Sequence, residues 1–571
     1  MNSFSVSRRR FLHSMALLSG SMFLDGCLRR IPTGLLSPPD PMSHLTVDVH
    51  CHFFNGTDLQ LERFLQSTQN ASHPAAAKAA PLAQYFNWKL APSGKSEMRK
   101  LRSEHMRVKD VQNNWKKAHS EPYSKFRHEV LKHRPAAAPI AGTTTTQGSV
   151  PWNAPEWQSK RWPKKYEDAE PHLVGGSLTA FEEYFQYRYV ALADYLDLYN
   201  KGTSRSIDLA ITHLVDYDWP LNDGKPARTQ LHDQVKLMER ISVLSQGRVH
   251  TFAPFDPFRE IAYRAGIRNA KWSALDALKQ WVTRFGCIGV KIYPTMGFAP
   301  YGNSEIALES WSGVSWKWLD DLKSIPDGKG GHATIGERLD DVLGEMYNWC
   351  LSIDLPVMAH TDLSNGLNET FDQFPAAKYW GALRECFTGL RVNFGHLGGF
   401  EKTSEKDWNM PSAAWPSGVN ARDLVALMSE NPSAPGGRFF ADSAYTENVL
   451  SDTDRATLLD VYQAALSWMA PGQPRPVLQN RLMYGSDWSL VMLENDMEKY
   501  FADFVSMFKQ LDAQAGESTE NLSNKFFGAN AVDYLGLQDG GTRKRLTDFY
   551  SDNKIAFGPQ GQPAWMSKIQ S

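Results

Sequence analysis

The chain has 571 residues, with 61 basic and 63 acidic side chains that give a formal net charge of −2. Hydrophobic residues make up 42% of it and charged residues 22%, which excludes intrinsic disorder and predicts a folded chain with a large core. The near-neutral charge excludes electrostatic recruitment of nucleic acid or an anionic membrane. No apolar run in the sequence reaches the roughly 18 residues that a membrane-spanning helix needs.

The first residues carry an export pattern. Ser7-Arg8-Arg9-Arg10-Phe11-Leu12 resembles a twin-arginine signal, and a modestly apolar stretch follows from Ser14 to Leu24. The next residues, Leu24-Asp25-Gly26-Cys27, are similar to a lipoprotein processing box, in which Cys27 becomes the acylated first residue. We therefore expect a signal over residues 1–27, a tether over 28–43, and a protein that is periplasmic or anchored to the membrane through Cys27. An ordinary amphipathic N-terminus is the alternative.

Eight short apolar runs follow, separated by stretches with helical periodicity. We predict strands at Leu45–His52, Ile207–Val215, Val249–Phe255, Cys287–Tyr293, Leu355–His360, Leu390–His396, Arg438–Ala441 and Arg481–Ser486. Between the fifth strand and the one before it, apolar residues from Leu339 to Cys350 recur at helical spacing and predict one buried face. This alternation predicts an α/β fold, a (β/α)8 TIM barrel over residues 44–540, followed by a C-terminal tail over 541–571.

Two long insertions interrupt the alternation, at about 55–205 after the first strand and at 299–331 after the fourth. The first is expected to be mostly helical, with helical pieces at Leu59–Gln66, Glu97–Lys117 and Leu178–Leu198. The second carries three tryptophans, Trp311, Trp316 and Trp318. Both follow the carboxyl ends of strands, where barrel enzymes build their sites, so we expect lids or specificity walls.

The cysteines beyond Cys27 show no paired spacing of the kind that zinc ribbons use, so they are expected to be buried free thiols. They are Cys51, Cys287, Cys350 and Cys386.

The motif Asp48-Val49-His50-Cys51-His52-Phe53 ends the first predicted strand. Because side chains alternate between the faces of a strand, His50 and His52 should point to one side and Cys51 to the other. Two imidazoles on one face can share a metal ion. An HxH motif alone is common by chance, so its weight depends on what recurs downstream.

Four more polar residues end later strands, namely Lys291, His360, His396 and Asp487. Each terminates an apolar run, at the junction between a packed strand and the active-site face of a barrel. One such residue alone is more often a satisfied core histidine or a surface aspartate. Polar residues at five strand ends, in this order, favour a common site.

This order of residues resembles the amidohydrolase superfamily, with HxH on strand one, Lys on strand four, His on strands five and six, and Asp on strand eight. The motifs are most similar to its amidohydrolase-related branch, which includes decarboxylases, hydratases and lactonases beside hydrolases. The resemblance covers about Leu45–His52 and Ile207–Leu537. It implies metal ligands drawn from His50, His52, Lys291, His360, His396 and Asp487.

Zn²⁺ is the cofactor that such a set suits, because imidazoles and a carboxylate hold it while open positions take water and substrate. The resemblance implies that Asp487 binds the metal or accepts the proton of the attacking water and passes it to the leaving group. It also implies that His396 binds a second metal or steadies the nucleophile and the oxyanion. A carboxylated Lys291 would bridge two ions; we expect one ion, with two as the alternative.

Three further residues are weaker candidates for substrate contacts, namely Tyr293, Asp442 and Trp488. A core or loop-capping position is the alternative for them. Asp48 could instead support the ligating imidazoles from behind. No phosphate loop, dinucleotide fingerprint or nucleophile elbow is present in the sequence.

The expected function is hydrolysis of a C–N or C–O bond in a small amide, lactone or ester by metal-activated water. A metal-dependent C–C lyase, a decarboxylase, uses the same ligands and stays open, as does a non-catalytic barrel lipoprotein that binds a ligand. The expected partner is a small-molecule substrate and not nucleic acid, with membrane contact only through Cys27. The sequence leaves a homo-oligomer open.

Overall fold

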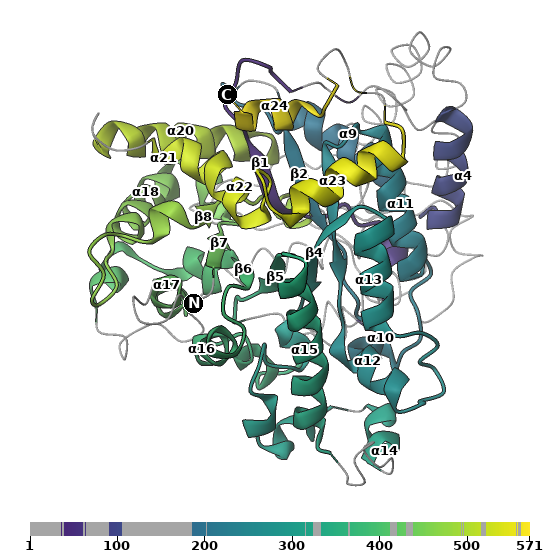
Figure 1. Cartoon of the computed structure of the whole chain (residues 1–571). Helices are drawn as coiled ribbons and strands as arrows, with labels where there is room; N and C mark the ends of the chain where they lie inside the picture. The colour runs from purple at the N-terminus through teal and green to yellow at the C-terminus, as the bar shows by residue number, and fades with distance from the viewer. Residues whose placement is uncertain are drawn as a thin grey trace, which may run out of the picture.

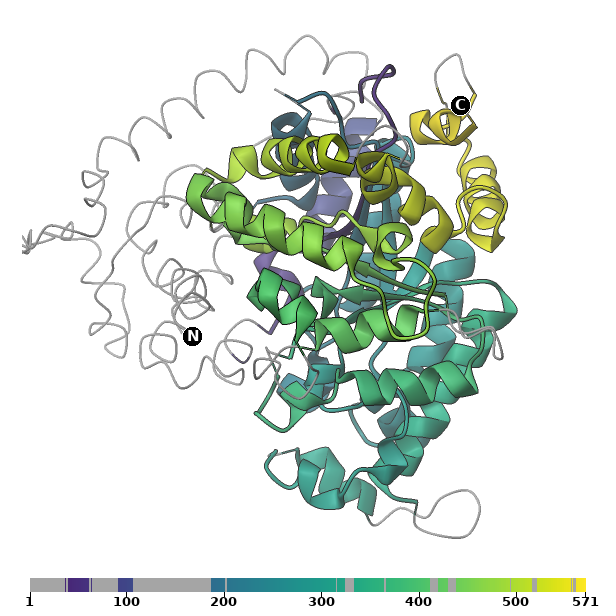
Figure 2. The same cartoon turned by 90° about the vertical axis from the view of Figure 1, so that its left-hand side faces the viewer.

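The computed structural model describes residues 36, 39–60, 63, 91–105, 186–200, 203–314, 316–323, 333–363, 366–410, 420–429, 438–492, 494, 496–515, 521–555, 557 and 561–570. The predicted signal, most of the tether and most of the first insertion lie outside these residues. Where they are described, the chain forms strands surrounded by helices (Figures 1 and 2).

The eight strands pair in parallel and in chain order. They are β1 (Val47–Cys51), β2 (Leu209–His213), β3 (Val249–Pro254), β4 (Cys287–Ile292), β5 (Val357–His360), β6 (Arg391–Gly395), β7 (Arg438–Asp442) and β8 (Leu482–Met483). Two backbone hydrogen bonds, from Val49 N to Tyr484 O (3.0 Å) and from Asp487 N to His50 O (2.7 Å), join the first strand to the chain around the last. The predicted (β/α)8 barrel is therefore confirmed, and each predicted strand contains an observed one or overlaps it closely.

Helices follow the strands as the periodicity predicts. The main ones are α11 (Leu231–Leu244), α12 (Pro257–Arg264), α13 (Ala274–Arg284), α15 (Ile335–Ser352), α16 (Ala377–Cys386), α17 (Ala421–Met428), α18 (Asp452–Ser467), α20 (Tyr500–Ala515) and α22 (Asn530–Leu535). In α15 a capping box between Thr334 and Glu337 satisfies the first free amides, and the predicted face from Leu339 to Cys350 is buried. Three short helices are α10 (Asp218–Asn222), α19 (Trp488–Val491) and α21 (Leu522–Asn524).

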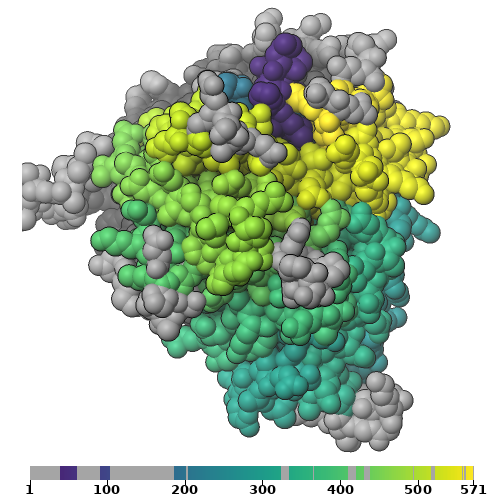
Figure 3. Space-filling model, turned by 60° about the vertical axis from the view of Figure 1, so that its left-hand side comes forward, coloured from purple at the N-terminus to yellow at the C-terminus, as the bar shows by residue number. Residues whose placement is uncertain are grey.

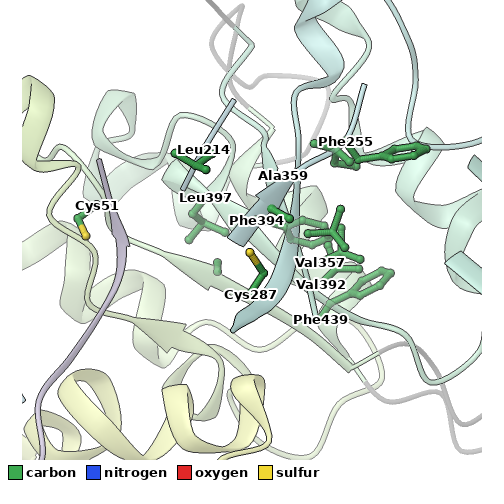
Figure 4. Packing of buried hydrophobic residues seen from close by; sticks show 14 of the residues in the cluster. Cys51, Leu214, Phe255, Cys287, Val357, Ala359, Val392, Phe394, Leu397 and Phe439 are labelled. Atoms are coloured by element: carbon green, nitrogen blue, oxygen red, sulfur yellow. The ribbon is translucent and has the colours of Figure 1, made fainter. Parts of the chain in front are cut away.

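Two hydrophobic clusters fill the described part of the barrel. One packs the outer faces of the strands against the helices, and Figure 4 shows Val357, Val392 and Phe439 from three adjacent strands lying close together in it. The other joins seven strands to the C-terminal helices, through Val47, Val49, Leu209, Ile211, Phe252, Ile288, Met358, Phe440 and Met483. A cluster shared by strands all round the sheet lies inside the barrel, so the barrel is packed and not a pore.

Both insertions are seen in part. From the first, α4 (Gly94–His105), α9 (Arg188–Tyr199) and the short turn Gly56–Asp58 are described, and these pieces are mostly helical as predicted. In the second, which includes α14 (Lys317–Lys323), the three tryptophans are buried. The indoles of Trp316 and Trp318 pack on Phe258 of α12, with ring centroids 4.8 and 5.5 Å away.

The segment beyond residue 540, expected as a tail, forms α23 (Gly541–Asp552) and α24 (Ala564–Gln570). The side chain of Trp565 is buried, and its Nε1 donates a hydrogen bond to Gly247 O (2.9 Å). Lys568 Nζ donates to Asp40 O (2.7 Å), so the C-terminal segment lies beside the chain that leads into β1 (Figure 3). Among the described helices, none has both the length and the apolar character that crossing a bilayer requires.

Of the four later cysteines, Cys51, Cys287 and Cys350 are buried as predicted, and no disulfide joins them. The prediction is wrong for Cys386, which is exposed. This residue is the last of α16, whose buried side chains are Trp380 and Leu383.

Candidate metal centre and active site

His50, on β1, is held from behind by the last residue of β7. Its Nδ1 lies 3.1 and 3.2 Å from the two carboxylate oxygens of Asp442, which is fully buried. The same carboxylate accepts hydrogen bonds from Asn393 Nδ2 (2.7 Å) and from the backbone N–H of His396 (3.0 Å). A proton on Nδ1 satisfies this contact, and it leaves Nε2 of His50 with a free lone pair.

Two other imidazoles are oriented in the same way, with backbone carbonyls in place of the carboxylate. His52 Nδ1 lies 2.8 Å from His213 O, and His396 Nδ1 lies 3.0 Å from Ala444 O. In both, the opposite nitrogen faces Asp487: His52 Nε2 is 3.8 Å from Oδ1, and His396 Nε2 is 3.9 Å from Oδ2. Three imidazoles with Nδ1 bound to an acceptor have Nε2 ready to bind a cation, as metal-binding histidines do.

Asp487 and His396 are placed by unusual backbone conformations. Their φ angles are 48° and 61°, in the left-handed region that costs a residue with a side chain about 1–2 kcal/mol. The amide of Asp487 donates to His50 O, and Ser489 Oγ donates to its carboxylate (3.2 Å). Such conformations recur where the surrounding structure holds functional groups in place.

The arrangement fits a divalent ion. One ligand atom each from His50, His396 and Asp487 lies within 4.8 Å of the others. Zinc–nitrogen bonds of about 2.0–2.1 Å in a tetrahedral site place neighbouring ligand atoms about 3.4 Å apart, so a small inward movement completes the contact. His52, at 3.8 Å from Asp487, lies beside this group. The chemistry of these donors, imidazole nitrogens with a carboxylate, suits zinc.

His50 and His52 are in the neutral form that binds metals. Burial, and next the charge of Lys291, lowers the pKa of His50 well below its usual value. Burial also lowers the pKa of His52 to about 4, although the carboxylate of Asp487 acts in the opposite direction. At neutral pH both rings therefore carry one proton and one free lone pair.

His360 and Lys291 lie beside the three-residue group. The His360 ring stacks on Tyr293 (centroids 4.5 Å apart, planes 10° apart) and lies 4.9 Å from the ring of His396. Lys291 Nζ is 2.6 Å from Met358 Sδ and 5.2 Å from the centre of the Tyr293 ring. Burial lowers the pKa of Lys291 to about 7, so much of it is an uncharged amine near neutral pH.

The three residues predicted to contact substrate, Tyr293, Asp442 and Trp488, lie in different surroundings. Tyr293 lines a cavity next to Lys291. Asp442 lies behind His50, and donors of the protein occupy both of its oxygens. Trp488 is 1% exposed, and it packs in the core against Tyr195 and Tyr199 of α9, with ring centroids 5.2 and 5.3 Å away. Of the three, Tyr293 is the one that lines a cavity.

The cavity beside Lys291 and Tyr293 lies at the carboxyl ends of β2, β3 and β4. Its other lining residues are Val215, Asp216, Phe255, Asp256, Met296 and Phe298. Arg259 binds Asp216 through two nitrogens, whereas Oδ2 of Asp256 is buried and has no hydrogen-bond partner in the described part of the chain. The cavity is small, with a volume of about 10 Å³, room for about one water molecule, and its lining mixes charged with apolar side chains.

A larger cavity, of about 520 Å³, lies at the amino ends of the strands. Four of its charged side chains form pairs, Arg391 with Asp354 (2.7 Å) and Arg438 with Asp533 (2.5 Å). Because these groups satisfy one another and lie at the opposite end of the barrel from the imidazoles, the cavity has no part in the candidate site.

Several residues near the site were not predicted. His213 ends β2, with Nε2 2.8 Å from Val49 O, and Asp256 follows β3. Both are polar residues at the end of an apolar strand, which is the pattern that identified His360. Gly485 has a different role, since a Cβ on it would lie 2.8 Å from Cβ of His50. No sequence pattern marks Gly485, because its neighbour comes from the other end of the chain.

Comparisons with known proteins add little to this geometry. No family model and no curated protein matches the chain. It is similar to the solved structure of a 2,6-dihydroxybenzoate decarboxylase bound to 2,6-dihydroxybenzoate, at 13% identity over 60% of this chain and 87% of the other, with a TM-score of 0.30. A candidate metal-dependent hydrolase from Lactobacillus casei ATCC 334 is 12% identical over 88% of this chain and 96% of its own, with a TM-score of 0.37.

A third structure, a candidate 2-pyrone-4,6-dicarboxylic acid hydrolase from Pseudomonas putida, is 13% identical over 60% of this chain and 87% of its own, with a TM-score of 0.29. Similarity at this level carries neither a substrate nor a reaction over to this chain.

Proposed function

We propose that the protein is a metal-dependent hydrolase of the amidohydrolase type, which uses an activated water molecule on a C–N or C–O bond of a small molecule. One observation carries the proposal: three imidazoles, His50, His52 and His396, each have Nδ1 bound to an acceptor, and they gather around Asp487. Structural histidines in a core do not need this shared orientation.

A bound zinc ion lowers the pKa of its water to about 7 and polarises a substrate carbonyl. Asp487 would accept the proton of the attacking water at a carboxylate oxygen and return it to the leaving nitrogen or oxygen. His396, whose proton lies on Nδ1, would contribute the lone pair of Nε2 to the ion. Asp442 would contact neither the attacking water nor the substrate, but it keeps the proton of His50 on Nδ1.

We propose that one ion is held, by His50, His396 and Asp487 with His52 beside them. Lys291 decides between this arrangement and a binuclear one. A pKa of about 7 makes its amine reactive toward carbon dioxide at neutral pH, as carboxylation requires. Without carboxylation, the same side chain lines the cavity with Tyr293 and would attract an anionic part of the substrate.

The test is elemental analysis of protein purified without chelator, combined with the variant His50→Ala. We expect about one zinc per chain in the wild type, and loss of both metal and turnover in the variant. Asp452→Asn, at a carboxylate with 96% side-chain exposure, is the matched control and should change neither. Full metal content and activity in His50→Ala would refute the proposal. Two zinc ions per chain, together with the extra mass of a carboxyl group on Lys291, would show a binuclear site in place of the proposed mononuclear one.

A panel of lactones, amides and carboxylic acids identifies the bond. Hydrolysis in ¹⁸O-labelled water places the label in the product, as expected here. Release of carbon dioxide from an acid would instead assign the same residues to a decarboxylase.

A further inference from the structure

One carboxylate links β1, which carries His50, to the segment after β8, which carries Asp487. Asp48 lies fully buried on β1, and its Oδ1 accepts hydrogen bonds from the amides of His50 (3.0 Å) and Ser486 (3.1 Å). Its Oδ2 accepts one from Ser486 Oγ (2.5 Å). Since Ser486 precedes Asp487, these bonds hold the backbones of both His50 and Asp487 in a fixed relation.

The remaining donor to this carboxylate comes from outside the barrel. Tyr195, in the middle of α9 in the first insertion, donates its hydroxyl to Asp48 Oδ2 at 2.6 Å. Burial, and next the negative charge of Asp48, raises the pKa of Tyr195 well above its usual value, so the hydroxyl keeps its proton and is the donor. Burial raises the pKa of Asp48 to about 7, and the hydrogen bonds from Ser486 and Tyr195 act in the opposite direction, because they stabilise the charged carboxylate.

The helix that carries Tyr195 is fixed in place at its first turn. Arg188 binds Glu97 of α4 through Nη1 (2.7 Å) and Asp58 through Nε (2.8 Å), and all three side chains are buried. Further along, Tyr195 packs edge-on against Trp488, the residue after Asp487. The insertion therefore contacts the site through a helix that is anchored at one end.

We propose that Tyr195 is a positioning residue for the metal centre: by its hydrogen bond to Asp48 it holds the carboxylate that sets the backbones of His50 and Asp487. The inference rests on the proposed function, since it concerns the affinity of that site for its ion. It gives the first insertion a role other than that of a lid, because part of it completes the support of the ligands. Outer contacts of this kind typically change metal affinity by 10–100-fold.

The test compares Tyr195→Phe with Tyr199→Phe. Both tyrosines lie on α9, one turn apart, both are buried, and both rings pack on Trp488. They differ at the hydroxyl, because the oxygen of Tyr199 has no hydrogen-bond partner among the described residues. The two variants thus lose the same atom from similar surroundings, and one of them alone breaks the contact with Asp48.

Zinc affinity is measured on the full chain by competition with a chromogenic chelator, and site geometry by the visible spectrum of the cobalt-substituted protein. We expect Tyr195→Phe to weaken zinc binding by about tenfold and to shift the cobalt bands, while Tyr199→Phe matches the wild type in both. Thermal unfolding of the apo forms separates this effect from general destabilisation.

Equal zinc affinity and an unchanged cobalt spectrum in Tyr195→Phe would overturn the inference while leaving the proposed function intact. A wild type that binds no zinc would overturn both. If Tyr195→Phe does not fold, zinc affinity and the cobalt spectrum are measured on Asp48→Asn in its place, and the same outcomes decide. This substitution keeps the size of the side chain and one acceptor oxygen.

Discussion

At the scale of single residues, the site depends on which nitrogen of each imidazole carries the proton. Asp442 sets this for His50, because a carboxylate accepts hydrogen bonds only, so Nδ1 must donate. Backbone carbonyls impose the same choice on His52 and His396. Three independent acceptors thus expose three Nε2 atoms toward one carboxylate, that of Asp487.

The variant Asp442→Asn should weaken metal binding by about 10–100-fold without unfolding the protein. The amide keeps the size of the side chain, but its –NH₂ group can face Nδ1 of His50 and favour the wrong tautomer. The dissociation constant for zinc, from chelator competition, checks the prediction. Asp407→Asn, a change at another buried aspartate, is the control, and an unchanged zinc affinity in Asp442→Asn would show that the tautomer of His50 does not matter.

Asp256 gives a prediction about pH. Burial, and next the like charge of Asp216, raises its pKa well above the usual 3.8. The folded state then binds a proton that the unfolded state has already released, so stability falls as pH rises from about 4 toward the folded pKa. In Asp256→Asn this loss disappears, while the oxygen that caps α12 by accepting from Phe258 N (3.0 Å) is retained.

We therefore expect the free energy of unfolding of Asp256→Asn, relative to the wild type, to rise between pH 5 and pH 8 by about 1 kcal/mol or more, since one pKa unit corresponds to about 1.4 kcal/mol. Urea unfolding at the two pH values measures it. A relative stability that is the same at both pH values would contradict the raised pKa. The exposed Asp452→Asn should show no such trend.

At the scale of elements, α9 and α4 are joined to the barrel by buried charge. Arg188 neutralises Asp58 and Glu97, and its side chain is 1% exposed. Removing one partner of a buried ionic group leaves the others without compensation and costs about 3–5 kcal/mol. Pairs nearer the surface are worth about 0–1 kcal/mol.

Arg188→Met should accordingly destabilise the insertion, so that hydrogen exchange in α4 and α9 becomes faster. Zinc binding should weaken as well, because Tyr195 on α9 would no longer hold Asp48. Arg438→Met, at an arginine whose side chain is 45% exposed and pairs with the 48% exposed Asp533, is the matched control and should change little. Exchange rates in α9 that equal those of the wild type would mean that this ionic group does not hold the helix.

The elements of the barrel could be predicted from the sequence because their signals are local. A short apolar run ending in a polar residue identifies β5 and His360, and the capped apolar face from Leu339 to Cys350 identifies α15. The contacts of Tyr195 could not be predicted, since a tyrosine in an insertion carries no mark of its partner. The sequence places Asp442 at the right strand end, but its contact with His50 arises because β7 and β1 lie on either side of β8.

At the scale of the whole molecule, the site needs both ends of the chain. The amide of Asp487 donates to His50 O, and α22 to α24 close the amino end of the barrel. Leu546, Phe549 and Trp565 belong to the same apolar cluster as Val47 on β1. The metal-binding group can thus assemble only after almost the entire described chain has folded.

A site that forms only in the folded chain fits an export route that carries folded proteins, because the ion can be loaded before transport. We propose that Arg8 and Arg9, which lie outside the described residues, direct this route. Replacing both by lysine should leave the folded, zinc-loaded protein in the cytoplasm, as measured by cell fractionation and metal analysis, whereas Arg10→Lys alone should not. Normal export of the double variant would contradict the twin-arginine interpretation. Cys27→Ser tests the anchor separately: an exported but soluble variant is expected where the wild type is bound to the membrane.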